Sequence, residues 1–252
     1  MVEIQNLSCG YSGKNVLSQL SLTAPEGCLT AIIGPNGCGK STLLKAMTGI
    51  LPYEGSIQIR GQELRQLSPK DRARMLALVP QNRSVPEITV EKLVLHGRFP
   101  YLSYPRSYRQ QDKAIAKAAM EQIGILDLKD RQLSSLSGGE RQKAYIAMML
   151  AQETPVVVMD EPTSFLDISC RFELMALAKE LSRKGKNVIM VIHDLQLALT
   201  YADRIALMEQ GCIRSFGTPG DVLESGWMER VFSIRIGQTK TPAGTQFYFS
   251  PL

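Results

Sequence analysis

The hydrophobic pattern along the chain alternates between the spacing of strands and the spacing of helices. Residues 2–7 and 20–24 alternate apolar and polar positions, which is typical of half-buried antiparallel strands. The unbroken apolar runs at 156–159 and 188–192 instead predict strands covered on both faces, as in a parallel sheet. Helical spacing follows the apolar strand at 29–33. The pattern therefore predicts an α/β protein with a mainly parallel sheet and an antiparallel β-subdomain at its N-terminus.

A different pattern occupies the middle of the chain. From residue 82 to about 150, helical stretches separated by prolines replace most of the strands, and we interpret this region as a helical lobe inserted into the core. No Pro/Gly/Ser-rich linker divides the chain, so we expect one domain over residues 1–236. Residues 237–252 carry no recognisable motif, and we expect a short C-terminal tail there.

Composition narrows the class of protein. The chain has 252 residues and a formal net charge of +5 without any Lys/Arg run, which is weak support for nucleic-acid binding and is compatible with a position near anionic lipid. No apolar run reaches the length of about 18 residues that a membrane span needs, and we expect no secretion signal. The five cysteines form no C-x-x-C pair, so neither zinc nor a disulfide framework is favoured, and a cytoplasmic setting is expected.

The segment after the apolar strand at 29–33 has the pattern G-x-x-x-x-G-K-S. Its glycines let backbone N–H groups face an anion, and the helix that follows adds the positive end of its dipole. The lysine brings a mobile charge to the β/γ-phosphates, and the serine hydroxyl offers an oxygen ligand to Mg²⁺. The segment therefore predicts a phosphate-binding loop rather than a chance glycine-rich turn. Its residues are Gly34, Pro35, Asn36, Gly37, Cys38, Gly39, Lys40, Ser41 and Thr42.

A second candidate anion site opens the helix that follows Leu136. The residues Ser137, Gly138, Gly139 and Glu140 fit a capping box, with the serine as N-cap and the glutamate at the third helical position. Two glycines at the helix start also expose N–H groups that can bind phosphate. The two interpretations are compatible, and both are kept.

Polar residues at three predicted strand ends add candidate chemistry. Asp160 can hold Mg²⁺ through water, and Glu161 beside it can polarise a water for attack on a γ-phosphate. Gln81 can orient that water or complete the Mg²⁺ shell, although an ordinary polar strand end explains it better when it is taken alone. His193 ends another buried strand at the same expected sheet edge, where open α/β sheets bind ligands.

Tyr11 lies in the turn region between the first two strands. Its ring can stack on an adenine, since base–aromatic stacking contributes about 1–3 kcal/mol whatever the base. The alternative is a turn tyrosine packed on the sheet. We favour stacking because a phosphate loop follows one strand later.

Taken in order, two phosphate-binding helix starts, an Asp-Glu strand end, an intervening Gln and a later His resemble the ATPase subunit of ABC transporters over roughly residues 1–236. The resemblance implies a P-loop NTPase core with an inserted helical lobe, and ATP and Mg²⁺ as cofactors. It also implies a homodimer that holds each ATP between the Walker A loop of one subunit and the signature motif of the other.

The same resemblance assigns a role to each motif of this chain. Residues 34–42 match the Walker A loop, residues 136–140 the signature motif and residues 164–167 the D-loop, in which Phe165 replaces the small residue or histidine common in the family. The single residues are Tyr11 for adenine stacking, Gln81 for the Q-loop, Asp160 and Glu161 for Walker B, and His193 for the switch histidine.

Within the family, residues 95–101 and 217–223 are similar to the importers of iron(III)-siderophores, haem and cobalamin. This likeness implies a peripheral protein on the cytoplasmic face of the cell (inner) membrane that powers a polytopic permease. An extracytoplasmic substrate-binding protein would act through the permease, and no nucleic acid would bind. We expect the lobe around residues 82–105 to dock on the permease, with Arg98 at the contact. The alternatives are an exporter ATPase and a non-transport ABC ATPase acting on nucleic acid or the ribosome.

Overall fold

The computed structural model describes residues 1–81, 85–164, 166–242 and 244–252, and it divides the chain into two compact units. The first unit combines residues 1–67 with 174–252, and the second is the continuous segment 68–173. The second unit is wider than the predicted lobe of residues 82–150, because it also contains α2 (Pro69–Met75), β6 (Leu76–Val79) and β7 (Val156–Asp160). The predicted α/β class, with mainly parallel strands and an antiparallel N-terminal sheet, is confirmed.

An antiparallel sheet forms the N-terminal part of the first unit. Its strand order is β2 (Lys14–Ala24), β1 (Val2–Tyr11), β4 (Glu54–Ile59) and β5 (Gln62–Glu63). Every second residue at the start of β1 is buried, because successive side chains of a strand point to opposite faces. The strands predicted at 2–7 and 20–24 are therefore real but are parts of longer strands.

Parallel strands form the rest of the core of the first unit. β3 (Leu29–Ile33) pairs in parallel with β8 (Asn187–Val191) on one side and with β9 (Arg204–Glu209) on the other. The antiparallel β10 (Cys212–Gly217) closes the edge beside β9. All five residues of β3 and of β8 are buried, in keeping with their apolar sequences. At their carboxyl ends, β3 leads to α1 (Lys40–Met47) and β8 leads to α7 (Leu195–Tyr201).

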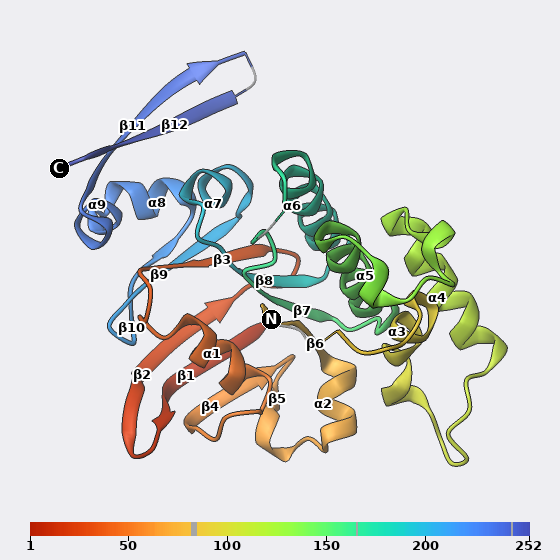
Figure 1. Ribbon diagram of the computed structural model, residues 1–252. Coiled ribbons are helices and arrows are strands. Elements are labelled where there is room, and N and C mark those ends of the chain that lie inside the picture. The colour runs from red at the N-terminus through yellow and green to blue at the C-terminus, as the bar shows by residue number, and fades with distance from the viewer. Residues whose placement is uncertain (82–84, 165, 243) are drawn as a thin grey trace. The chain divides into compact units, whose positions relative to one another are not determined.

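The C-terminal segment of the first unit ends in a β-hairpin (Figure 1). After α8 (Pro219–Glu224) and α9 (Trp227–Phe232), strands β11 (Ile234–Thr241) and β12 (Gly244–Pro251) pair antiparallel over their whole length. Most of the region 237–252, for which the sequence suggested only a tail without a motif, thus lies in β11 and β12. The hairpin contacts α7 and α9.

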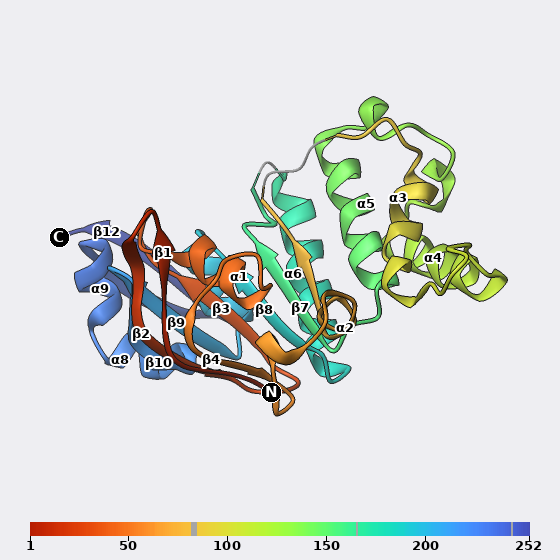
Figure 2. The ribbon, with the colours of Figure 1, turned by 90° about the horizontal axis from the view of Figure 1, so that it is seen from below.

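The second unit holds three helices that pack against one another (Figure 2). They are α3 (Val90–His96), α4 (Gln110–Ile123) and α5 (Gly138–Ala151), and they enclose a core of buried aliphatic side chains. The unit also contains the parallel strand pair of β6 and β7. Helix α6 (Ile168–Arg183) begins in this unit, and the boundary to the first unit falls within it. The described ranges also contain four 3₁₀ turns: η1 (Leu64–Gln66), η2 (Phe99–Tyr101), η3 (Leu126–Leu128) and η4 (Leu133–Ser135).

Across the ranges that the structure describes, no helix has both the length and the apolar character needed to cross a membrane.

Candidate nucleotide-binding site

The loop between β3 and α1 has a backbone that only glycine adopts easily. Gly34, Gly37 and Gly39 have φ values of 155°, 78° and 106°. A Cβ added at Gly34 would lie 2.3 Å from the carbonyl oxygen of Met208 in β9, so the close approach of the loop to this strand also requires glycine. These glycines shape a concave backbone at the N-terminus of α1, where N–H groups and the helix dipole favour an anion.

Lys40 is the first residue of α1 and is only 5% exposed. Its ammonium group donates to the carbonyl oxygens of Gly34 at 2.8 Å and Pro35 at 3.0 Å, which holds the positive charge over the loop. The ammonium group also makes a long hydrogen bond of 4.0 Å to Cys38 Sγ, and sulfur is a weak acceptor that a phosphate oxygen can replace. Burial raises the pKa of the Cys38 thiol in the same loop, so this group stays neutral and does not oppose a phosphate.

Two further predicted residues lie in the first unit. His193 is exposed and follows β8, in which Val191 pairs with Ile32 of β3. The structure therefore brings His193 and the phosphate loop to the same edge of the sheet. Tyr11, at the end of β1, is 44% exposed. Its hydroxyl accepts a hydrogen bond from the Lys45 ammonium at 3.3 Å, and this ammonium lies 5.5 Å from the centre of the ring. Adenine stacking on Tyr11 stays a prediction.

In the second unit, the structure brings Gln81 and Glu161 together. Both residues follow the carboxyl ends of paired parallel strands, since Val79 of β6 lies opposite Met159 of β7. The side-chain amide of Gln81 donates to Glu161 Oε2 at 2.5 Å, and Ser164 Oγ donates to the same oxygen at 3.4 Å. Gln81 is therefore hydrogen-bonded to the predicted catalytic carboxylate. Its position in the sequence alone did not indicate this contact.

The backbone of Glu161 is itself unusual. Its φ is 48°, in the left-handed region that residues with a Cβ rarely adopt. Such a conformation costs about 1–3 kcal/mol and persists only where the surroundings hold it in place. Asp160, the last residue of β7, precedes it and is partly buried. The strained residue follows directly after the buried strand, and no residue pattern in the sequence predicted its conformation.

The predicted capping box at the start of α5 is confirmed. Ser137 Oγ accepts from the Glu140 N–H at 3.3 Å, and the Ser137 N–H donates to Glu140 Oε2 at 2.8 Å. The backbone hydrogen bond from Ser137 lowers the pKa of Glu140. A lowered pKa means that this contribution to stability is present above the ordinary carboxyl pKa and disappears as the pH falls through the folded value. A Cβ at Gly138 would meet no atom within 4 Å, so the helix start is open, and phosphate binding there stays a prediction.

The D-loop residues are described except for Phe165, which lies outside the described ranges. Asp167 accepts a hydrogen bond from the backbone N–H of Cys170 at 2.8 Å, and this bond lowers the pKa of the carboxyl group. The carboxylate therefore caps the first turn of α6.

The residues present fit the predicted cofactors. The glycine cradle and Lys40 suit a polyphosphate, and the proposed metal ligands Ser41, Gln81 and Asp160 offer the hard oxygen atoms that Mg²⁺ prefers. No group of three His, Cys, Asp or Glu side chains that could hold a metal occurs among the described residues.

The expectation that Arg98 contacts a permease is wrong. The side chain is 5% exposed and its guanidinium makes ion pairs with Asp112 and Glu153 inside the second unit. Phe99 and Tyr104, in the same segment, are 47% and 97% exposed. Exposed and buried residues alternate within this segment, and Arg98 is among the buried ones.

Comparison with known proteins now identifies the family. Residues 17–164 match the family model described as ABC transporter. The chain belongs to the ABC transporter family. The matched range holds the phosphate loop, Gln81, the capped start of α5 and the Asp160-Glu161 pair, whereas Tyr11 and His193 lie outside it.

Relatives of known name extend this likeness over nearly the whole chain. The achromobactin transport ATP-binding protein of Dickeya dadantii (strain 3937) is 39% identical over 98% of this chain and 92% of its own length. The ferric enterobactin transport ATP-binding protein of Escherichia coli (strain K12) is 39% identical, with coverages of 92% and 86%. The hemin import ATP-binding protein of Chelativorans sp. (strain BNC1) is 34% identical, with coverages of 100% and 98%. These relatives support an ATP-binding transporter subunit.

Solved structures show the same fold. An inward-facing transporter assigned to the metal-chelate type of ABC transporter has a TM-score of 0.86 and 27% identity, covering 100% of this chain and 96% of its own. A bacterial Atm1-family ABC exporter with bound ATP has a TM-score of 0.78 and 25% identity over 91% of this chain and 41% of its own. Because importers and exporters of the ABC family share this fold, the direction of transport has to be argued from sequence likeness.

Gly34→Ala should distort the phosphate loop. The added Cβ meets the Met208 carbonyl at 2.3 Å and forces a methyl group into a left-handed conformation. We expect a loss of about 1–3 kcal/mol in the free energy of unfolding in urea and an increase of about tenfold or more in the Kd for ATP. Gly220→Ala is the matched control, because its nearest neighbour would be Thr218 Oγ1 at 3.8 Å. Equal stability and affinity in the two variants would contradict the cradle geometry.

Proposed function

We propose that the chain is the ATP-hydrolysing subunit of a membrane importer for iron(III)-siderophore, haem or cobalamin type cargo. The observation that carries the proposal is the nearly full-length similarity to relatives named for achromobactin, ferric enterobactin and hemin transport. The importer-like segments at 95–101 and 217–223 support the same choice. Hydrolysis of ATP would supply the energy, and partner proteins would recognise the cargo.

Within this function each polar group has a task that suits its chemistry. Bound ATP with Mg²⁺ supplies a γ-phosphoryl group for transfer to water. Glu161 accepts the proton of that water, and the hydrogen bond from Gln81 to Oε2 fixes which way the carboxylate faces. Lys40 would hold the β/γ-phosphates, and Tyr11 would stack on the adenine. Ser41, Gln81 and Asp160 would offer oxygens to Mg²⁺, and His193 would contact the γ-phosphate.

Glu161→Gln should nearly abolish ATP hydrolysis while ATP still binds. The amide keeps the shape of the side chain but cannot accept a proton, so turnover should fall by about 10² to 10⁴. Phosphate release and equilibrium binding of ATP by the purified chain are the measurements. Glu121→Gln, an exposed glutamate of α4 paired with Lys117, is the matched control. Turnover at the normal rate in Glu161→Gln would remove this residue from the role.

We infer that each ATP is shared by two copies of the chain. Lys40 and Ser137 each lie at a helix start that is suited to binding phosphate. Both can contact the same γ-phosphate only if they approach it from opposite sides. A homodimer in which each copy supplies its phosphate loop to one ATP and its α5 start to the other satisfies this requirement.

Mixing two variants, each of which damages a different half of the site, tests the shared site. Lys40→Ala and Ser137→Ala homodimers each lack an intact site, whereas a mixed dimer combines one undamaged phosphate loop with one undamaged α5 start. The mixture should therefore trap nucleotide at one site per dimer, measured with labelled ATP after removal of free nucleotide. A mixture that traps no more than either homodimer, although mixed dimers are shown to form, would sink the model.

We further propose that the chain is peripheral at the cytoplasmic face of the cell (inner) membrane and docks on a polytopic permease through the segment around residues 82–105. A substrate-binding protein would deliver cargo to that permease from outside, and nucleic acid would not be a partner. The exposed rings of Phe99 and Tyr104 support this segment, with the Arg106 guanidinium 4.9 Å from the centre of the Phe99 ring. An aromatic and cationic surface of this kind is typical of binding interfaces.

A photo-crosslinking amino acid at position 104 should capture the permease in membranes from the cells that make this chain. Tyr104 is 97% exposed, so its replacement leaves the fold intact. Mass spectrometry should identify a polytopic importer subunit, and the same crosslinker at Tyr248, which is 60% exposed in the first unit, is the control. Capture of an exporter subunit, a ribosomal protein or DNA at position 104 would contradict the import proposal.

A further inference from the structure

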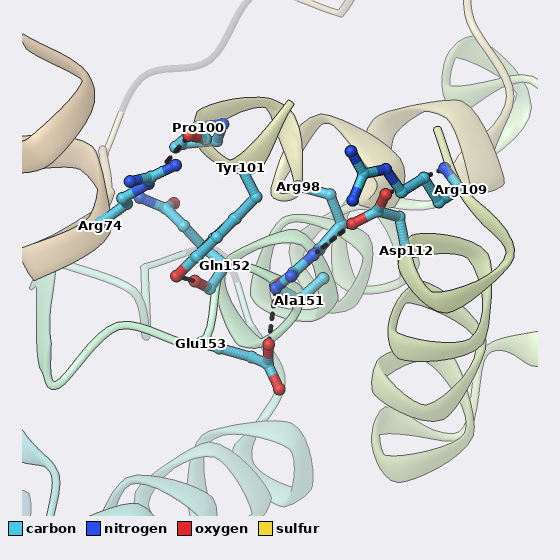
Figure 3. A network of polar contacts seen from close by, with 9 residues as sticks. All are labelled: Arg74, Arg98, Pro100, Tyr101, Arg109, Asp112, Ala151, Gln152 and Glu153. Atoms are coloured by element: carbon cyan, nitrogen blue, oxygen red, sulfur yellow. Dashed lines mark hydrogen bonds and ion pairs between the residues drawn. The ribbon is translucent and has the colours of Figure 1, made fainter. Parts of the chain in front are cut away.

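A network of polar contacts surrounds the C-terminal end of α5 (Figure 3). The buried guanidinium of Arg98 donates to Asp112 Oδ1 at 3.2 Å, to the Ala151 carbonyl at 2.9 Å and to the Glu153 carboxylate at 2.7 Å. One cation thus joins the first turn of α4 to the end of α5, where helix carbonyls carry partial negative charge. Two carboxylates and a carbonyl compensate the buried charge.

Tyr101 and Gln152 extend this network to the strands of the second unit. The Tyr101 hydroxyl donates to the Gln152 carbonyl at 2.8 Å, while its ring centre lies 4.0 Å from the guanidinium carbon of Arg98. The side-chain amide of Gln152 donates to the carbonyls of Ala73 at 2.5 Å and Leu76 at 3.3 Å. These two carbonyls lie near the end of α2 and at the start of β6. We call Arg98, Tyr101 and Gln152 the α5 junction.

The α5 junction lies between the functional elements of the second unit. Helix α5 begins with the Ser137 cap and ends at the junction, and the chain then continues into β7, which leads to Glu161. β6, which the junction contacts through Leu76, leads to Gln81. Near its other end, α5 is tied to the residue after Glu161, because the Gln142 amide donates to the Pro162 carbonyl at 2.9 Å. The position of α5 relative to β6 and β7 is therefore set at both ends of the helix.

A small tilt of α5 at the junction produces a larger displacement of the Ser137 end of the helix. An α-helix of this length behaves as a rod of about 20 Å, so a tilt of about 5° at one end displaces the other by about 2 Å. Misplacement of a substrate-positioning group by about 1 Å can reduce a reaction rate on the order of 10²-fold. The hydrogen bonds of the junction are thus able to influence a group that they do not touch.

We propose that Arg98, Tyr101 and Gln152 are positioning residues for ATP hydrolysis, because the α5 junction sets where Ser137 lies relative to Gln81 and Glu161. The inference rests on the proposed function. The three residues act through α5, β6 and β7, and the hydrogen bonds described above stay inside the second unit. Loss of the junction should therefore lower kcat by a larger factor than it raises the KM for ATP, since Lys40 and the rest of the phosphate loop are unchanged in these variants.

Tyr101→Phe is the first test, since it removes a single hydroxyl and keeps the ring against Arg98. Loss of one hydrogen bond of this kind should reduce kcat about fivefold. Arg98→Lys keeps the charge but loses the fork that reaches three acceptors, so kcat should fall by about tenfold or more. Tyr108→Phe is the matched control: this tyrosine packs on the same helical core, and its hydroxyl has no hydrogen-bond partner within the described part of the chain. The control should turn over ATP at the normal rate, and thermal unfolding should verify that each variant is folded.

A double-mutant cycle separates positioning from mere stability. In a Ser137→Ala background, the effect of Tyr101→Phe on kcat should shrink to less than twofold, because the group being positioned is already missing. If the two effects simply multiply, or if folded Tyr101→Phe and Arg98→Lys hydrolyse ATP at the normal rate, the junction is structural only. If the unmodified chain hydrolyses no more ATP than Glu161→Gln, the proposed function fails, and this inference fails with it.

Discussion

The parallel pairing of β3 on both of its sides is the constraint on which the rest of the first unit depends. All residues of β3 are buried between two parallel neighbours, so the chain reaches the protein surface only at the two ends of this strand. The phosphate loop and His193 both follow carboxyl ends in this arrangement, so they lie at the same edge of the sheet. The side chain of Asp203 fixes the other end of β3, accepting from the Leu29 N–H at 2.9 Å.

The helix starts of the chain differ in how far their own side chains already satisfy the N–H groups of the first turn. The helix α1 has no side-chain cap and no acidic residue in its first turn, which leaves its N–H groups and dipole to an external anion. By contrast, α7 is capped by the Asp194 carboxylate through the N–H groups of Gln196 and Leu197. The start of α5 is intermediate, because Ser137 and Glu140 use part of the donor set while its glycines leave space around the remainder.

Local patterns predicted much of this molecule, and the exceptions have a common physical cause. The G-x-x-x-x-G-K-S loop, the capping box and the buried strands each depend on residues close in sequence, so their chemistry can be read without the fold. The burial of Arg98 depends on Asp112, Ala151 and Glu153, which lie 14 to 55 residues away. The attachment of Gln81 to Glu161 spans 80 residues and arises only when β6 and β7 pair. The C-terminal hairpin was not predicted for a related reason. Its two strands pair with each other and show no obvious apolar face in the sequence.

The left-handed backbone of Glu161 has a consequence for how this chain changes over evolutionary time. Glycine at this position would adopt the same φ without strain, so the backbone conformation that carries this carboxylate costs folding free energy. Selection for a more stable fold and selection for faster ATP hydrolysis therefore favour different residues at position 161. In homologues that no longer hydrolyse ATP, the strained residue could be replaced by glycine. The residue at this position should therefore indicate whether a homologue is still selected for hydrolysis.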